Sequence, residues 1–256
     1  MNPWWGYAIK ACWGPRRENP AQIGGRYWRM LQSLAPIDPL FSGWEFGGLT
    51  RFWDMPQGPG DELSGLIADC VARADDGDPT PIFGYGFAAG TRSRSKTSLT
   101  IHVSAGSYVP VLPYFGNKAD LITEPLNEEN AALIKLSVFK PALLAMAAAW
   151  DATWCAAYPW DIVPLWPKPG PGRPHFLMAW ITYLSPRFAP LVDPPRSAIV
   201  EYTPAGGIVM TATEDRFDVD NPRHLAIARE IEAAMAPVNA LPWPPDAEPE
   251  PPASQG

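Results

Sequence analysis

Residues 7–20 read Tyr7-Ala-Ile-Lys-Ala-Cys-Trp13-Gly14-Pro15-Arg16-Arg17-Glu18-Asn19-Pro20. This stretch is the most informative part of the chain about its fold. The residues before Trp13 predict a short strand, and Trp-Gly-Pro predicts a chain reversal. Asn19 then supplies a helix cap, with Pro20 at the first helical position. The apolar residues that follow keep the spacing of one helical face: Ile23, Tyr27, Met30, Leu31 and Leu34. Large apolar groups at chain corners, without a nucleophile or ligand among them, favour a binding scaffold over an active site.

Working outward, short strands and helices follow one another without strict alternation. Apolar patterning predicts strands at 7–12, 81–88, 97–103, 108–112, 176–184, 198–203 and 208–213. Helices are expected at 20–35, at 61–75, from Asn127 to Trp150 with a kink at Pro141, and from a cap at Asp220 or Asn221 to about 237. We expect ordered loop at 36–60 and irregular chain at 158–174. This order predicts an α+β fold with a mixed or antiparallel sheet and packed helices.

Composition favours one large domain over residues 1–241, followed by a disordered tail over 242–256. Apolar residues make up 46% of the 256, which is enough to bury a core. Proline is abundant: it accounts for 32 of the 256 residues, about 12%, against a usual share of about 5%. The tail combines prolines with Asp246, Glu248 and Glu250, a composition typical of disorder.

The charge and the absence of targeting segments limit the partners. A net charge of −7 argues against broad nucleic-acid binding and fits a basic protein partner better. The N-terminus has no basic region followed by an apolar run, and nothing is long enough to span a membrane. We therefore expect a cytoplasmic protein that contacts neither membrane nor nucleic acid directly.

The residue types of common catalytic and metal sites do not converge in the sequence. Three cysteines without CxxC spacing indicate neither a disulfide framework nor a zinc site. His102, His175 and His224 are far apart, and no Gly-x-Ser-x-Gly elbow occurs. The interpretation is that the chain has no catalytic residue, no cofactor and no metal ion. A small hydrolase or transferase whose site lies among Trp and His side chains remains an alternative.

Acidic residues are concentrated in two runs. Residues 61–78 hold six acids and one arginine, and residues 214–220 hold four acids and one arginine. Each run can simply be a solvated face, or it can form a docking patch that steers a basic partner. For docking, the candidate residues are Asp75, Asp76, Asp78, Glu214 and Asp215.

Several short motifs, taken in order, resemble the immunity protein 52 family of bacterial polymorphic toxin systems. In the N-terminal half they are Trp13-Gly14-Pro15-Arg16 with Glu18, Ile37-Asp38-Pro39 and Trp44. In the C-terminal half they are Trp180-Ile-Thr-Tyr183-Leu184-Ser185-Pro186, Ala198–Glu201, and Gly206-Gly207 through Glu214 to Asn221, Pro222 and His224. The resemblance spans roughly residues 7–236. It departs at Ala179, where glycine is expected, and at Gly24-Gly25 inside a helix.

The resemblance implies an immunity protein that binds and neutralises a cognate toxin, in a setting such as type VI secretion. Members of this family are thought to inhibit nucleases with a restriction-endonuclease-type fold, of the fifth Tox-REase class. The expected partner is thus a nuclease domain, blocked by stoichiometric occlusion. A secretion-system adaptor is the further alternative.

Overall fold

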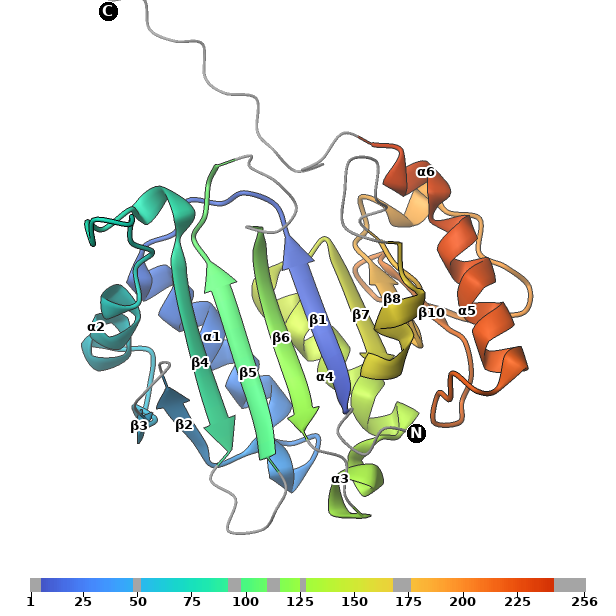
Figure 1. The fold of residues 1–256 in the computed structure, drawn as a ribbon, viewed down its shortest axis with the longest axis horizontal. Coiled ribbons are helices and arrows are strands. Elements are labelled where there is room, and N and C mark those ends of the chain that lie inside the picture. Colours follow the sequence, from blue (N-terminus) through green and yellow to red (C-terminus); the bar gives the residue numbers. More distant parts are fainter. Residues whose placement is uncertain are drawn as a thin grey trace, which may run out of the picture.

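A computed structural model describes residues 6–47, 52–91, 98–109, 116–124, 128–167 and 176–241. Within these residues, ten strands form a single sheet in the order β3-β2-β4-β5-β6-β1-β7-β8-β10-β9 (Figure 1). Every pair of neighbouring strands is antiparallel. The expected α+β class in one domain is therefore confirmed. The predicted tail over 242–256 lies outside the described residues.

The strands are β1 (Tyr7–Trp13), β2 (Trp44–Gly47), β3 (Phe52–Asp54), β4 (Tyr85–Thr91), β5 (Ser98–Ala105), β6 (Asn117–Glu124), β7 (Trp154–Pro159), β8 (Ile181–Leu184), β9 (Ile199–Tyr202) and β10 (Ile208–Thr211). The α-helices are α1 (Pro20–Leu34), α2 (Asp61–Asp69), α3 (Glu128–Leu133), α4 (Leu136–Trp150), α5 (Pro222–Ala234) and α6 (Ala236–Asn239). Short 3-10 turns are η1 (Pro39–Phe41), η2 (Pro81–Phe83), η3 (Trp160–Leu165) and η4 (Ala189–Leu191).

The structure confirms the predicted asparagine caps at the starts of α1 and α5. Asn19 Oδ1 accepts a hydrogen bond from Gln22 N at 2.9 Å, and Asn19 N donates to Gln22 Oε1 at 2.9 Å. This reciprocal capping satisfies two backbone groups at once. Asn221 Oδ1 caps α5 by accepting from Arg223 N at 3.0 Å. Helix α1 continues unbroken through Gly24-Gly25, because its cap and its buried face outweigh the low helix propensity of glycine.

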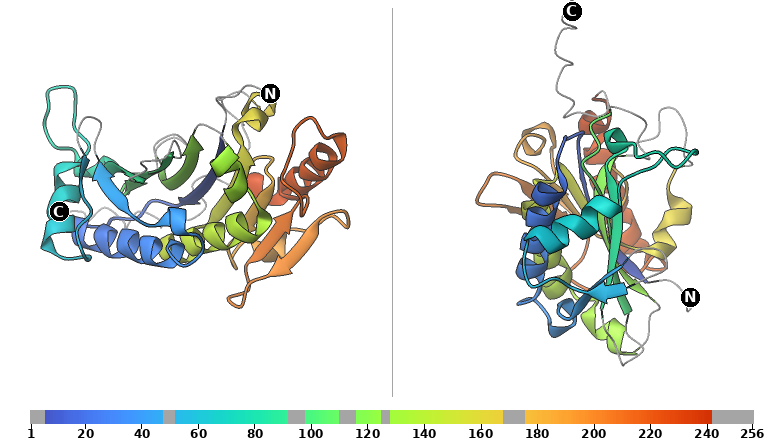
Figure 2. Two further views of the ribbon diagram at one scale, coloured as in Figure 1. Left: turned by 90° about the horizontal axis from the view of Figure 1, so that it is seen from below. Right: turned by 90° about the vertical axis from the view of Figure 1, so that its left-hand side faces the viewer.

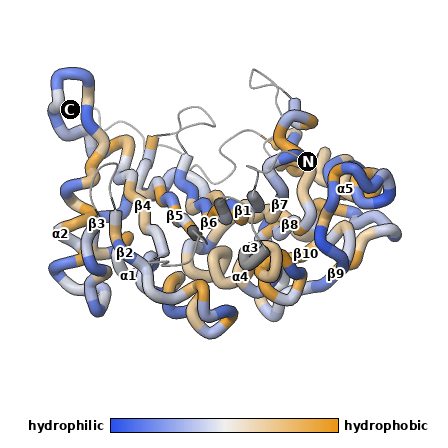
Figure 3. Tube along the Cα trace, turned by 60° about the horizontal axis from the view of Figure 1, so that its bottom comes forward, coloured by the Kyte–Doolittle hydropathy of each residue, from blue (hydrophilic) through white to orange (hydrophobic). Residues whose placement is uncertain are grey.

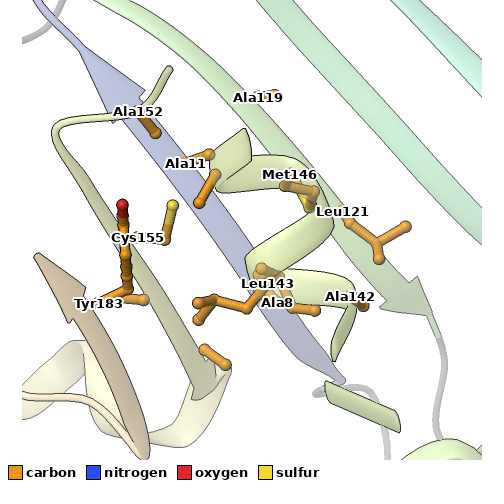
Figure 4. Close-up of a cluster of buried hydrophobic side chains, with 14 of the residues drawn as sticks. Ala8, Ala11, Ala119, Leu121, Ala142, Leu143, Met146, Ala152, Cys155 and Tyr183 are labelled. Atoms are coloured by element: carbon orange, nitrogen blue, oxygen red, sulfur yellow. The ribbon is translucent and has the colours of Figure 1, made fainter. Parts of the chain in front are cut away.

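Helices cover the two faces of the sheet unequally. Helices α1, α2 and α4 lie together on one face, whereas α5 lies on the opposite face at the β8–β10 end (Figure 2). On the first face, Ala11, Ala119 and Leu121 of the sheet meet Leu143 and Met146 of α4 (Figure 4). All five side chains are nearly or fully buried. Burying each large side chain contributes roughly 1.5–3 kcal/mol, so this layer holds much of the core.

Some predicted boundaries are wrong because tertiary pairing overrides local pattern. The helix expected over 61–75 ends at Asp69, since Ala72 N donates to Gly84 O and Gly86 N donates to Cys70 O. The chain therefore leaves the helix in order to pair with the start of β4. Val71 and Arg73 then form bridges to Tyr85 and Pro79.

The helix expected over 127–150 is two helices, and they separate at an extended Lys135. Pro141 lies inside α4 without ending it. Strand β7 falls partly within the stretch predicted to be irregular, and β2 and β3 lie in the predicted loop. The strand expected over 108–112 does not form at residues 108–109, and its other residues lie outside the described chain. Among the described residues, no helix is long and apolar enough to cross a bilayer.

Candidate functional site: the open face of the sheet

The face of the sheet opposite α1 and α4 carries rows of side chains that cross the central strands. The strand register aligns one row across β4, β5, β6, β1 and β7, made of Ala88, His102, Asp120, Lys10 and Ala156. A row of five strands spans about 19 Å at a strand spacing of about 4.8 Å. The adjacent row contains Gly86, Ser104, Lys118, Cys12 and Trp154. We call the part of these rows on β4, β5, β6 and β1 the open face.

Exposure along the rows shows where this face is accessible. His102 and Gly86 are exposed, while Lys10 and Lys118 are partly exposed. At β7 the rows close, since Ala156 is 1% and Trp154 5% exposed. The turn η3 follows β7 and stands on the same side of the sheet, with the open face curving between it and the hairpin at residues 71–80 (Figures 2 and 3). The open face thus lies between two projecting segments.

A carboxylate between two ammonium groups forms the centre of the open face. Asp120 is 3.7 Å from Lys10 Nζ and 3.4 Å from Lys118 Nζ. The Asp120 side chain is 12% exposed, against 27% for Lys10 and 38% for Lys118. Burial by itself would lower the pKa of Lys10, but the attraction of Asp120 outweighs it and raises that pKa. Lys10 therefore stays charged at neutral pH, and with two lysines and one aspartate the cluster has a formal net positive charge.

The other ionisable groups near this cluster are poorly suited to nucleophilic chemistry. Burial raises the pKa of the Cys12 thiol to about 11. Burial also raises the pKa of Tyr158. A thiol that stays protonated at neutral pH is a weak nucleophile. The described residues contain no group of three or more His, Cys, Asp or Glu side chains placed to hold a metal ion. The arrangement presents charged side chains on the accessible face of the sheet.

The sequence-predicted acids Asp75, Asp76 and Asp78 lie together on the hairpin turn at residues 73–79. All three are exposed. The turn is held by Arg73 Nη1, which donates to Gly77 O at 3.0 Å, and by Asp76 Oδ1, which accepts from Asp78 N at 3.0 Å. Gly77 has a φ of +91°, which favours glycine at the tip. This acidic hairpin rises on the side of the open face, beside the start of β4 (Figure 2).

Glu214 and Asp215 lie elsewhere, in the exposed turn between β10 and α5. The next residue, Arg216, donates from Nε to the hydroxyl of Tyr7 at 3.1 Å, so this turn lies beside the first residue of β1. Strand β4 starts at the opposite end of the central strands from the start of β1 and is three positions from β1 in the sheet. Three strand spacings amount to about 14 Å, and the length of a seven-residue strand adds about 20 Å along the strand direction. The structure therefore brings the three hairpin acids together but leaves Glu214 and Asp215 in a separate patch.

The motif residues of the chain reversal form a buried ionic corner. Glu18, with a side chain only 4% exposed, pairs with Arg26 Nε at 2.6 Å and approaches Arg16 Nε at 3.1 Å. Arg26 also reaches Asp151 at 2.5 Å. Trp13 stacks on Trp150 with ring centroids 4.6 Å apart. These contacts fix the start of α1 against the end of α4.

The remaining N-terminal motif residues lie at the other end of α1. Asp38 Oδ1 accepts from Leu40 N at 2.9 Å and begins η1, and Trp44 Nε1 donates to Phe41 O at 2.9 Å. Helix α1 has 15 residues and is roughly 22 Å long. The motifs therefore secure two corners of the fold, one at each end of α1.

A cleft with a volume of about 510 Å³ lies beside this second corner, lined by Trp28, Leu31, Phe41, Trp44, Met55 and neighbouring residues. Its lining includes Glu45 and Asp54 but no histidine, cysteine or lysine. An enzyme site among Trp and His side chains, the alternative raised by the sequence, would need a histidine in such a place. The cleft does not supply one.

Sequence reasoning missed the lysines, the aspartate and the histidine of the open face. The alternation of His102 with Leu99, Ile101 and Val103 indicated a strand with one polar face. Nothing local showed that Lys10 and Asp120, 110 positions apart in sequence, would be direct partners on neighbouring strands. Register between distant strands is a tertiary property, so only the structure could bring these residues together.

Comparisons with known proteins agree with the motifs. A sequence model of the family described as immunity protein 52 matches residues 6–241. No curated protein matches the chain significantly. Among solved structures, the fold is similar to the Pseudomonas aeruginosa T6SS protein PA0821, with a TM-score of 0.50 and 10% sequence identity. That match covers 90% of this chain and 73% of the other. Because the family match extends over nearly the whole described chain, this protein belongs to the immunity protein 52 family.

Proposed function

We propose that this chain neutralises a cognate bacterial toxin by binding it stoichiometrically and covering its working surface. The observation that carries the proposal is the family match over residues 6–241. The solved structure with a similar fold is titled a T6SS protein, which supports a secretion setting for the pair. The toxin is proposed to be a nuclease with a restriction-endonuclease-type fold, and the inhibitor acts in the cytoplasm without catalysing a reaction itself.

The acidic hairpin supports a basic partner of this kind. Asp75, Asp76 and Asp78 place three carboxylates on one short, hydrogen-bonded turn that projects from the sheet. A nuclease is basic around its phosphate groove, so these charges can steer association and hold the two proteins in register. Because the turn is already ordered by its own hydrogen bonds, binding needs little additional ordering there.

Co-expression and purified components together test the function. Cells that express the cognate toxin domain, to be sought among the genes next to this one, should survive when they also express this chain. The purified chain should stop DNA cleavage at a molar ratio near one to one. Continued toxicity with abundant, folded inhibitor present would refute neutralisation. Loss of toxicity without any effect on DNA cleavage would refute the nuclease assignment alone.

The two acidic patches can be compared directly by charge reversal. We expect Asp75→Lys with Asp76→Lys to slow association with the toxin by about tenfold at low salt, and by less at high salt. Glu214→Lys with Asp215→Lys is the matched pair in the separate patch. If neither pair alters the association rate, the acidic patches do not steer the toxin.

A further inference from the structure

We propose that the open face of the sheet seats a carboxylate-bearing segment of the toxin, bound by Lys10 and Lys118. This inference rests on the proposed function and names the surface and the chemistry through which it operates. Helices α1, α2 and α4 pack on the opposite face, so the open face is free of them (Figure 2). The occupant is a loop or strand end of the toxin that presents aspartate or glutamate.

The charge of the open face selects that chemistry. Two ammonium groups share the single carboxylate of Asp120, at 3.7 Å and 3.4 Å. The second ammonium therefore has electrostatic capacity left for another anion. Lys118 is the more exposed of the pair, with 38% of its side chain accessible. An incoming carboxylate that reaches Lys118 gains an ion pair in a partly desolvated place, where such pairs are stronger than on the open surface.

The residues beside the lysines leave room for a segment to approach the backbone. On β4, the positions that point to this side are Gly86, Ala88 and Gly90, which have minimal side chains. A methyl group added at Gly86 would meet no other atom within 4 Å. These small residues of β4 thus lie directly beside the polar side chains of β5 and β6 in the same rows.

Exposed aromatic groups at one end of the open face suit an interface. Phe83, just before β4, is 48% exposed, and Tyr108, just after β5, is 37% exposed. Tyr108 N donates to Ile82 O at 3.3 Å, which ties these two segments together. The guanidinium of Arg17 lies 5.3 Å from the Tyr108 ring and adds another cation at this end. Aromatic residues and arginine are the types enriched at the centre of protein interfaces.

The acidic hairpin and the basic open face stand on the same side of the sheet. A partner that fits both has a basic surface beside an acidic one. The hairpin would contact the basic part of the partner, and the lysines would contact its acidic part. A reversed or shifted orientation of the partner would therefore place like charges together. Such a pattern gives specificity of orientation as well as attraction.

Removal of one lysine from each face tests the proposal. Lys118→Met should weaken equilibrium binding of the neutralised toxin domain by about tenfold or more. Lys140→Met is the matched control, because Lys140 on α4 also makes one ion pair, with Glu201 at 2.6 Å, but stands on the helical side. It should leave the dissociation constant within about twofold. Equal effects of the two substitutions, or none from Lys118→Met, would overturn the proposal.

A steric block provides a test that does not depend on charge. Gly86→Tyr should leave folding intact, because tyrosine suits an exposed strand position better than glycine does. It should nevertheless reduce toxin binding strongly. Gly65→Tyr is the control, since Gly65 on α2 is also exposed and a Cβ added there would meet no atom of another segment within 4 Å. Unchanged binding by folded Gly86→Tyr protein would overturn the proposal.

Acetylation footprinting of the complex locates the contact independently. Lys118 should be protected from acetylation when the toxin is bound, while Lys140 should stay reactive. Protection of Lys140 with a reactive Lys118 would place the toxin on the helical side and refute this docking surface, while neutralisation itself would stand. If the chain neither binds nor neutralises the toxin domain, the proposed function fails, and this inference fails with it.

Discussion

Replacement of Glu18 by glutamine should destabilise the protein more than replacement of Asp151, the exposed carboxylate that pairs with the same two arginines, by asparagine. Glu18 lies between two guanidinium groups, at 2.6 Å from Arg26 Nε and 3.1 Å from Arg16 Nε. Its side chain is 4% exposed, whereas those of Arg16 and Arg26 are 26% and 21% exposed. Glu18→Gln therefore leaves two neighbouring cations without their shared carboxylate.

The size of the effect follows from burial. Breaking a fully buried ion pair costs about 3–5 kcal/mol, and partial exposure of both arginines reduces this to roughly 2–3 kcal/mol. Asp151 also binds Arg26, but its side chain is 66% exposed. Asp151→Asn should cost less than about 1 kcal/mol. Asparagine also tolerates the left-handed backbone at this position, where φ is +48°.

Urea unfolding measures both variants on one scale. With a slope of about 3 kcal/mol per molar, Glu18→Gln should lower the midpoint by about 0.8 M. The slope should stay unchanged, because the same surface is exposed on unfolding. A shift under about 0.2 M for Glu18→Gln would refute the reasoning. An equal shift for Asp151→Asn would show that burial does not distinguish the two carboxylates.

Three further changes test other parts of the structure. Asn117, 2% exposed, donates to Gly14 O at 2.7 Å and to Ser107 O at 2.9 Å and accepts from Ser107 N at 2.9 Å. Asn117→Ala should therefore cost about 3 kcal/mol, and a urea-derived loss under about 1 kcal/mol would contradict this. Gly6→Ala would place a Cβ 1.5 Å from Thr123 O, whereas Gly86→Ala meets open space. A thermal melt should show a loss of several degrees for the first change only, and equal melting temperatures would disprove the clash. Burial raises the pKa of the Cys12 thiol from 9.0 to about 11, so the folded state holds this proton more tightly than the unfolded state. Its contribution to stability is complete below pH 9.0 and is lost as the pH rises to about 11. Melts across this range should show a shallower decline for Cys12→Ala than for the parent protein, and identical slopes would count against the shift.

Local signals sufficed wherever a structural element depends on its own residues. Asn19 and Asn221 begin helices as predicted, because a side-chain cap acts within three residues of itself. The apolar positions predicted for α1 are all buried, since helical periodicity places them on one face. The family motifs also needed no coordinates, because they are runs of residues in a given order.

Predicted element boundaries were wrong where backbone pairing with a distant segment competes with the local secondary-structure preference. The apolar stripe of α2 continues to Val71 and Ala74, yet the chain leaves the helix at Asp69 to pair with β4. Backbone hydrogen bonds to another strand replace those of a further helical turn. Strand β7 was missed because all of its residues are buried, so it shows no alternation of polar and apolar positions.

The sequence by itself determined the fold class, the capped start of α1 and the family, because each depends on residues near one another in the chain. The relative positions of the acidic residues, in contrast, were decided by the tertiary structure. One hairpin unites Asp75, Asp76 and Asp78, while Glu214 and Asp215 lie near the start of β1, at the opposite end of the central strands. The motif at residues 13–18 became an ionic corner only when α4 supplied Asp151 and Trp150. Likewise, the register of β1, β5 and β6 created the row of His102, Asp120 and Lys10. Strand register depends on the packing of the whole sheet, so it decides which distant charges meet.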